Sequence, residues 1–177
     1  MFVVSKYVLA NKYYHDWGDI PTWETCTLRT WLNEDFYNSA FSDSEKEMIV
    51  TRKLKNPDYG AKGASGGNDT EDKVFLLSVE DVTNPEYGFA DKAKTKDINR
   101  RSAASVAAGR RVPVDPDNPD FDEYPTTDGF CSEIYWLRNK GSISYNAACV
   151  WYEGKLNTDN IHEDEMGVRP AIVIKLK

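Results

Sequence analysis

The hydrophobic positions in the first part of the chain change their spacing along the sequence. Residues 2–10 are rich in valine, tyrosine and leucine and predict a strand. Further on, Leu28, Trp31 and Leu32 recur at helical spacing, which predicts a helix over about residues 23–32 with an apolar stripe. The chain is therefore expected to begin with a strand that leads into helical turns.

Capping residues and a short apolar run mark the next elements. Asn33 is expected to cap a second short helix, and residues 42–45, Ser-Asp-Ser-Glu, fit a capping box ahead of a third. Residues 49–55 can extend as a strand. Residues 74–78 form an apolar run typical of a buried strand, and the serine that ends it can cap a helical turn over residues 79–82.

The remainder of the chain combines one alanine-rich segment, one proline-rich segment and several short apolar runs. A helix is expected over residues 96–108, with Gly109 as its terminator. Residues 112–128 contain four prolines and six acidic residues, which predicts an extended, ordered surface loop. The C-terminal part predicts β structure at residues 134–138, 145–152, 155–157 and 168–176.

Two arginines stand among bulky apolar neighbours in this β-rich part. Arg138 ends the run Tyr-Trp-Leu-Arg, and Arg169 lies within Gly-Val-Arg-Pro. A buried guanidinium is costly unless its donors are matched by acceptors. Trp136, Arg138, Gly167 and Arg169 are therefore expected to be structural residues of a polar network that fixes the core.

Length and charge narrow the classes of partner. The 177 residues suit a single domain over residues 1–177. A formal net charge of −7 argues against nucleic acid or an anionic membrane as the main partner, because both require a basic surface. No apolar run is long enough for a transmembrane helix, so no membrane insertion is expected. The first residues lack the features of a signal peptide, and the sequence indicates no cellular compartment.

Candidate metal ligands are few. The three cysteines form no CxxC spacing and are expected to be small apolar fillers. Residues 66–72 combine glycines with oxygen-bearing side chains, a composition that suits calcium, although a turn of this composition also needs no ion. The ligands of such a calcium site would be Asn68, Asp69, Glu71 and Asp72, and no other cofactor is expected.

A recognition surface is expected on the C-terminal strands. If Ala148 and Val150 point inward, then Cys149 and Trp151 point outward, because successive side chains of a strand alternate between faces. Exposed aromatic rings beside hydrogen-bonding side chains are typical of recognition surfaces. The alternative is that these rings cover a thin core edge and the polar residues fill turns. The predicted ligand-binding residues are Tyr145, Asn146, Trp151, Tyr152, Asn157, Asp159, Asn160 and His162.

Catalysis has less support in the sequence. The chain has two histidines, His15 and His162, with no Ser-His-Asp arrangement and no metal-ligand spacing, so no catalytic residue is assigned. A closed pocket that gathers His162 with Asp164 or Glu165 would favour an enzyme.

Motifs along nearly the whole chain resemble a known family. They are Thr-Trp-Glu at residues 22–24, Leu-Arg-Thr-Trp-Leu-Asn at 28–33, the segment 67–78, Trp-Leu-Arg at 136–138 and Gly-Val-Arg-Pro-Ala at 167–171. Together they resemble the bacterial domain of unknown function six-two-seven-three. The two arginine motifs are in turn similar to the closing strands of C-type-lectin-like domains of the formylglycine-generating type.

The resemblance implies a fold more clearly than an activity. It implies an α+β, C-type-lectin-like fold with a twisted, mostly antiparallel sheet, two or more helices and long loops, and a first strand or two missing ahead of residue 1. The paired cysteines that hold copper in formylglycine-generating enzymes and the calcium-binding motifs of sugar-binding lectins are absent. We therefore expect a non-catalytic module that recognises a protein or a glycan, and that can be surface-exposed as part of a larger bacterial protein. The alternatives are a structural appended domain and an enzyme related to the formylglycine-generating type.

Overall fold

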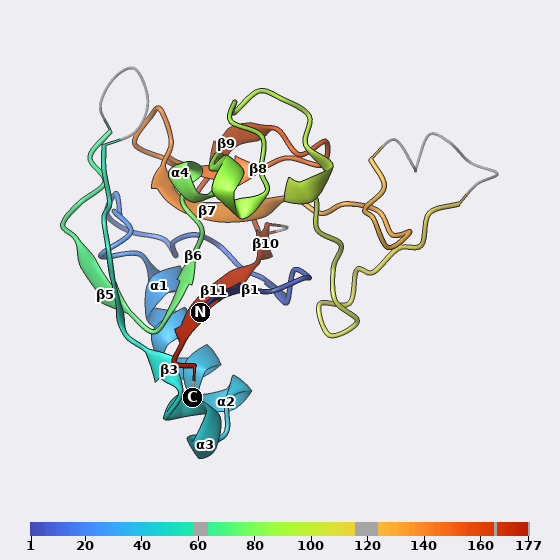
Figure 1. Ribbon diagram of the computed structural model, residues 1–177. Helices are drawn as coiled ribbons and strands as arrows, with labels where there is room; N and C mark the ends of the chain where they lie inside the picture. Colours follow the sequence, from blue (N-terminus) through green and yellow to red (C-terminus); the bar gives the residue numbers. More distant parts are fainter. Residues whose placement is uncertain (59–63, 116–123, 165, 177) are drawn as a thin grey trace.

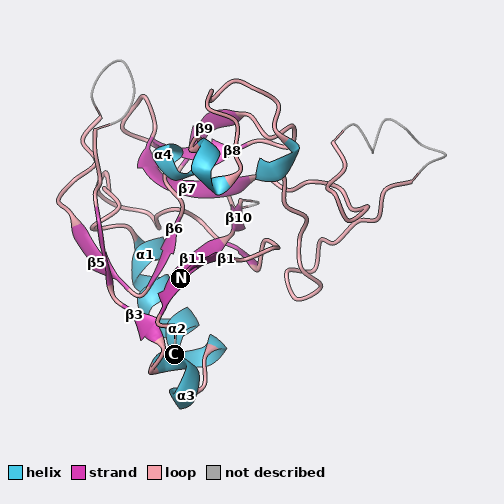
Figure 2. Ribbon diagram, in the orientation of Figure 1, coloured by secondary structure: helices cyan, strands magenta, loops and turns pink. Residues whose placement is uncertain are grey.

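The computed structural model describes residues 1–58, 64–115, 124–164 and 166–176. One group of short helices lies near the two chain ends and another lies at the top of the view, while curled, mostly antiparallel sheets and long connections make up the rest (Figure 1, Figure 2). The fold is therefore mixed α/β with few helices. Its terminal strand, which is drawn in red in Figure 1, lies at the centre of the molecule.

Strand β11 (Pro170–Ile174) is the middle of the first sheet. It pairs antiparallel with β1 (Phe2–Val4) along one edge, and with β6 (Val74–Leu76) and β3 (Ile49–Val50) along the other. The branched and aromatic residues of these strands suit a pleated, half-buried surface. Among the described residues, backbone pairing thus joins these three strands from the first half of the chain only through the C-terminal segment.

The second sheet has the order β2-β10-β7-β8-β9. Its strands are β2 (Ala10–Asn11), β10 (Gly167–Val168), β7 (Tyr135–Lys140), β8 (Asn146–Val150) and β9 (Leu156–Asn160). β10 and β7 run parallel, and the other pairs are antiparallel. Since β10 and β11 are separated by Arg169 alone, the end of the chain runs through both sheets.

The helical segment near the start is almost continuous. It comprises α1 (Thr27–Trp31), a π-helical turn η1 (Leu32–Phe36) and α2 (Tyr37–Ala40). The helix predicted from residue 23 begins four residues later, because residues 22–26 form a turn in which the Cys26 N–H donates to the Thr22 carbonyl oxygen. The predicted cap at Asn33 is wrong, since Asn33 lies within η1.

Both sequence signals for capped turns are confirmed. Ser42 and Glu45 form a capping box on α3 (Asp43–Lys46), and Ser78 caps α4 (Val79–Val82). The predicted buried strand is also confirmed, because every residue from Val74 to Ser78 is buried. The remaining short elements are β4 (Arg52–Leu54), β5 (Thr70–Asp72), and the 3₁₀ turns η2 (Pro85–Tyr87) and η3 (Ile98–Arg100).

The helix predicted over residues 96–108 is wrong. Only η3 is helical there, and Ala103 and Ala104 are buried in extended backbone beside Val8. The Val8 N–H donates to the Ala103 carbonyl oxygen at 3.0 Å, and the Ser105 N–H donates to the Val8 carbonyl oxygen at 2.8 Å. Small side chains therefore serve close strand packing here, which overrides their helix propensity. Of the predicted proline-rich loop, residues 116–123 lie outside the described residues.

Candidate functional site

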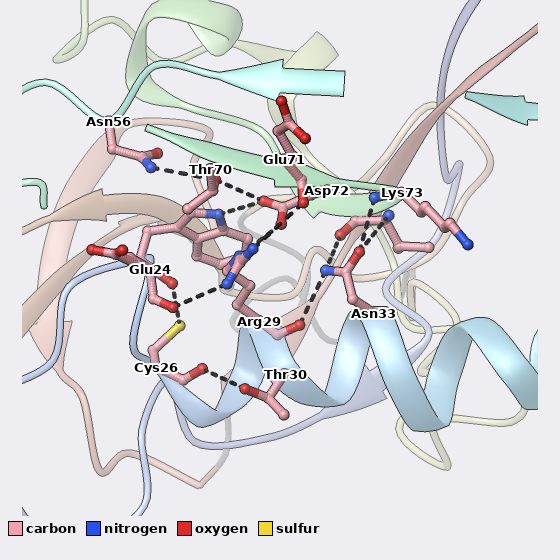
Figure 3. Close-up of polar contacts among 12 residues, drawn as sticks. Glu24, Cys26, Arg29, Thr30, Asn33, Asn56, Thr70, Glu71, Asp72 and Lys73 are labelled. Carbon is pink, nitrogen blue, oxygen red and sulfur yellow. Dashed lines mark hydrogen bonds and ion pairs between the residues drawn. The ribbon is translucent and has the colours of Figure 1, made fainter. Parts of the chain in front are cut away.

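A buried carboxylate joins the helical segment to the β5–β6 region (Figure 3). Asp72 is 1% exposed and accepts hydrogen bonds from Trp23 Nε1 at 2.9 Å, Arg29 Nε at 2.6 Å and Thr70 Oγ1 at 2.9 Å. Asn33 completes the junction, because its side-chain oxygen accepts from the Lys73 N–H at 2.8 Å. We call Trp23, Arg29, Asn33 and Asp72 the Asp72 network.

The candidate calcium ligands lie in and beside this network and do not converge. Asp72 is occupied by the three donors just described, and Glu71 points away from it because side chains alternate along β5. Asp69 forms an ion pair with Lys55 at 2.5 Å, and the Asn68 amide donates to Glu24 at 3.0 Å. Across the part of the chain that the structure describes, no three acidic, histidine or cysteine side chains are placed to hold a metal ion.

The two arginines singled out in the sequence are each 7% exposed. Arg138 Nη1 donates to Asp81 at 2.7 Å and to the Leu76 carbonyl at 3.1 Å, although its Nε finds no acceptor among the described residues. Arg169 donates to the Ser5 carbonyl at 2.9 Å and to the Tyr135 hydroxyl at 3.0 Å. Each guanidinium therefore ties a strand of the second sheet to segments outside that sheet.

The electrostatics of the Arg138 pair favour the charged carboxylate. Burial alone would raise the pKa of Asp81, but the charge of Arg138 and the Ser78 backbone N–H lower it below the ordinary value. The neighbouring Trp136 is fully buried, and its Nε1 donates to the Lys12 carbonyl at 2.9 Å.

Gly167 allows two segments to approach closely. A Cβ atom there would lie 2.6 Å from Val8 Cγ1 and 2.7 Å from the Ile134 carbonyl oxygen. A larger residue would therefore force β10 away from its neighbours.

The predicted recognition residues fall into two groups at opposite ends of the β8–β9 hairpin. Asn146 pairs with Asn160 at one end, and Val150 pairs with Leu156 at the other. A strand rises about 3.3 Å per residue, so about 13 Å separates the two ends. Tyr145, Asn146, Asn160 and His162 lie at the first end, Trp151, Tyr152 and Asn157 at the second, and Asp159 faces Ala147 near the first.

The second end is less exposed than the sequence suggested. Cys149 is fully buried rather than outward-facing, because both faces of β8 are covered. Trp151 is partly buried against the core, and Tyr152 meets it edge-on with ring centroids 5.7 Å apart. The Trp151 ring therefore contributes to core packing, whereas Tyr152 remains exposed. A small hollow of about 210 Å³ lies beside Trp151 and Asn157.

The first end presents an exposed aromatic stack that the sequence did not single out. The Trp17 ring is 83% exposed and lies over the His162 ring, with centroids 4.5 Å apart and an interplanar angle of 14°. His162 Nδ1 lies 2.9 Å from the His15 carbonyl oxygen. The two loops are held together by backbone bonds from Tyr14 and His15 to Ile161. We call Trp17 and His162 the Trp17 platform.

A groove of about 510 Å³ opens beside this platform. Asp16 and Asp164, which line it, are close neighbours in the chain of Trp17 and His162. His162 itself does not line this groove, and Glu165 lies outside the described residues, so the groove does not gather His162 with Asp164. Burial lowers the pKa of His15, which directly precedes the groove residue Asp16 in the chain. The groove is lined by Asn11, Lys12, Tyr13, Asp16, Thr27, Leu28, Thr30, Trp31, Asp35 and Asp164.

Comparison with known proteins identifies the family. The sequence model of the family described as Domain of unknown function (DUF6273) matches residues 1–176. The chain belongs to this family. No curated protein and no solved structure matches the chain. Within the part of the chain that the structure describes, no helix is both long and apolar enough to span a membrane.

The motifs by which the chain resembles the DUF6273 family are largely structural in this fold. Trp23, Arg29, Asn33 and Asp72 form the Asp72 network, and the two arginines tie the second sheet to segments outside it. The Trp17 platform lies outside these motifs. The resemblance therefore concentrates on the scaffold, and ligand-facing residues have to be found from the geometry.

One structural residue of the DUF6273 domain was missed by sequence reasoning. Arg100 is fully buried, and its five N–H donors reach the backbone carbonyl oxygens of Val82, Thr95, Gly154, Ala90 and Lys92. It thereby holds the long connection between α4 and η3 against the β8–β9 turn. Backbone acceptors leave no side-chain pattern in the sequence, so the pair Arg100-Arg101 gave no signal for this role.

A buried lysine lies at the end of β7. Lys140 is 2% exposed, and its Nζ donates to the Ser144 carbonyl at 2.6 Å. Burial lowers the pKa of Lys140 to about 8, because removing an ammonium group from water disfavours the charged form.

Proposed function

We propose that this domain is a non-catalytic module on a C-type-lectin-like scaffold, and that it binds a glycan at the Trp17 platform and the adjoining groove. The observation that carries the proposal is the Trp17 ring, which is 83% exposed yet fixed by stacking on His162. Leaving so large an apolar ring in water is unfavourable, so an ordered exposed tryptophan marks a surface suited to a partner.

The chemistry around this ring suits a sugar. A pyranose has an apolar C–H face that can stack on an indole, and a rim of hydroxyl groups that need hydrogen-bonding partners. The groove offers such partners in Asn11, Thr27 and Thr30, together with the Tyr13 and Trp31 rings. A rigid platform beside a polar groove supports a glycan over the flat, extended patch expected for a protein partner.

The charge of the groove narrows the class of glycan. Asp16, Asp35 and Asp164 line it, whereas Lys12 is its one basic lining residue among the described residues. The Lys12 ammonium lies 4.7 Å from the centre of the Trp31 ring. An excess of carboxylates attracts cationic groups and repels anionic ones. We therefore expect neutral and amino sugars to bind in preference to uronic acids.

The experiment is a titration with three soluble oligosaccharides: chito-oligosaccharide, its deacetylated cationic form, and oligogalacturonate. Calorimetry on the wild-type domain should show binding of one or both of the first two and none of the third. Trp17→Ala should lower that affinity at least tenfold without unfolding the domain, since surface substitutions usually change stability by less than about 0.5 kcal/mol. Asp164→Asn should weaken the cationic sugar more than the neutral one.

Tyr152→Ala provides the matched control, because Tyr152 is an exposed aromatic at the other end of the hairpin. It should bind as the wild type does. If Tyr152→Ala abolishes binding and Trp17→Ala does not, the Trp17 platform is the wrong site. If the wild-type domain binds none of the three sugars, nor any member of a broad glycan array, the glycan proposal fails.

A further inference from the structure

The outer edge of β1 carries backbone groups without partners. The Met1 amino group and the Ser5 N–H donate to Ile174 and Pro170 of the opposite segment, and the register places Val3 opposite Ile172 between them. In an antiparallel ladder, alternate residues bond inward, so the N–H and C=O groups of Phe2 and Val4 point outward. Among the described residues, no hydrogen bond reaches these four groups.

A few residues further along the chain, where it has passed into the second sheet, the N-terminal segment pairs outward with an extended segment. Val8 exchanges backbone hydrogen bonds with Ala103 and Ser105, which lie beside it in parallel orientation. Leu9 meanwhile donates inward to Val168. The N-terminal segment therefore has one outward edge that holds an extended segment of polypeptide, at Val8, and one that is left open, beside Phe2 and Val4.

An apolar groove of about 260 Å³ lies over this part of the sheet. Val3 and Ile172, which pair across β1 and β11, form its floor, and Phe36 and Phe41 line it from the helical segment. A strand added beside β1 would lie about 4.8 Å from it, with alternate side chains on the same face as Val3. Such side chains would extend the apolar surface of the groove.

We propose that the β1 edge is a docking site for an extended, apolar segment of a partner polypeptide, which adds a strand to the first sheet and places an apolar side chain in this groove. The four outward backbone groups specify the occupant, because donors and acceptors that repeat every second residue match a peptide backbone. The groove supplies the preference for an apolar side chain. This site is separate from the Trp17 platform and does not depend on glycan binding.

The probe is a capped eight-residue peptide that alternates valine and threonine, added to the isotope-labelled domain. Nuclear magnetic resonance should show shifted amide signals and slower hydrogen exchange at Phe2 and Val4, and fluorescence anisotropy should give the affinity. A peptide with serine in place of each valine should bind at least tenfold more weakly. Shifts that gather around the Trp17 platform instead, or no shifts at all, would overturn the proposal.

Two variants of Val4 separate the backbone edge from the side chain. Val4→Pro removes the outward N–H, while leaving the bonds of Met1, Val3 and Ser5 to β11, and should reduce peptide affinity at least tenfold. Val4→Thr keeps that N–H and should bind as the wild type does. Ala40→Trp fills the groove from α2 without altering the backbone edge, and should also weaken peptide binding. This variant tests the proposal if Val4→Pro proves unstable.

The remaining outcomes concern other occupants. Dimers that form with rising concentration in the absence of peptide, and that are lost in Val4→Pro, would identify a second copy of the chain as the occupant. That result would overturn the proposal of a partner segment. Equal peptide affinity for the wild type and a folded Val4→Pro variant would show that the backbone edge takes no part.

Discussion

Arg100 offers the sharpest test of what holds the long connection after α4 in place. Its guanidinium is fully buried and its five donors reach five backbone carbonyl oxygens, four of them between residues 82 and 95 and the fifth at Gly154. Arg100→Lys keeps the positive charge and most of the side-chain length. It offers only three donors, in a different geometry, so at least two carbonyl groups lose their partner.

The expected cost follows from these unpaired groups. Leaving one buried acceptor without a donor costs about 1–3 kcal/mol, so two such groups lower the free energy of unfolding by about 2–6 kcal/mol. This is a large part of the roughly 5–15 kcal/mol that stabilises a typical domain. The loss should be felt first in the segment that Arg100 holds, residues 84–97, and less in the central strands.

Urea denaturation of the wild type and Arg100→Lys would measure the change, with an unchanged slope showing that both unfold in the same way. Native-state hydrogen exchange should show faster exchange in residues 84–97. Arg101→Lys is the matched control, because among the described residues the Arg101 side chain makes one hydrogen bond, from Nη1 to the Pro125 carbonyl at 3.0 Å. Its change in the free energy of unfolding should stay within about 0.5 kcal/mol. A loss below about 1 kcal/mol for Arg100→Lys would refute the reasoning, since water would then be satisfying the carbonyl groups.

Three further substitutions test the core. The pKa of Lys140 is about 8 in the folded protein and about 10.5 when exposed, so the unfolded chain binds the proton more tightly and wild-type stability should rise between pH 8 and 10.5. Lys140→Met should remove this rise and add about 1–3 kcal/mol at pH 7, as measured by urea denaturation across that range. Arg169→Ala should cost about 2–6 kcal/mol, because the Ser5 carbonyl and the Tyr135 hydroxyl lose a donor, and a change within about 0.5 kcal/mol would mean that Arg169 stabilises nothing. Gly167→Ala should lower the melting temperature by several degrees, because its Cβ would meet Val8 and the Ile134 carbonyl; an unchanged melting temperature would show that β10 can shift freely.

Local signals in the sequence were sufficient for part of the fold. The capping boxes at Ser42 and Ser78 and the buried run that begins at Val74 depend on residues within a few positions of each other, and the structure has them as expected. The burial of Arg138 and Arg169 followed from their apolar neighbours. Capping and burial of this kind are decided by neighbours in the chain, so the order of the residues is enough to predict them.

Features that depend on distant segments could not be predicted in this way. Ala103 and Ala104 favour a helix locally, but their backbone groups pair with Val8 about a hundred residues away in the chain. Cys149 was placed outward by strand alternation, whereas both faces of its strand are covered. Trp17 lies in a loop, where no periodicity shows that it will stack on His162.

The place of β11 also bears on how the domain folds. Strands β1, β3 and β6 all come from the first half of the chain, yet each finds its partner only when residues 170–174 arrive. Contacts between such distant residues are slow to form, because a long loop must close before any of them is made. During synthesis, the three apolar strands of the first half would therefore remain unpaired until the C-terminal segment is made, and could pair with strands of other chains. Deleting residues 170–176 should leave a chain that aggregates rather than a smaller folded domain.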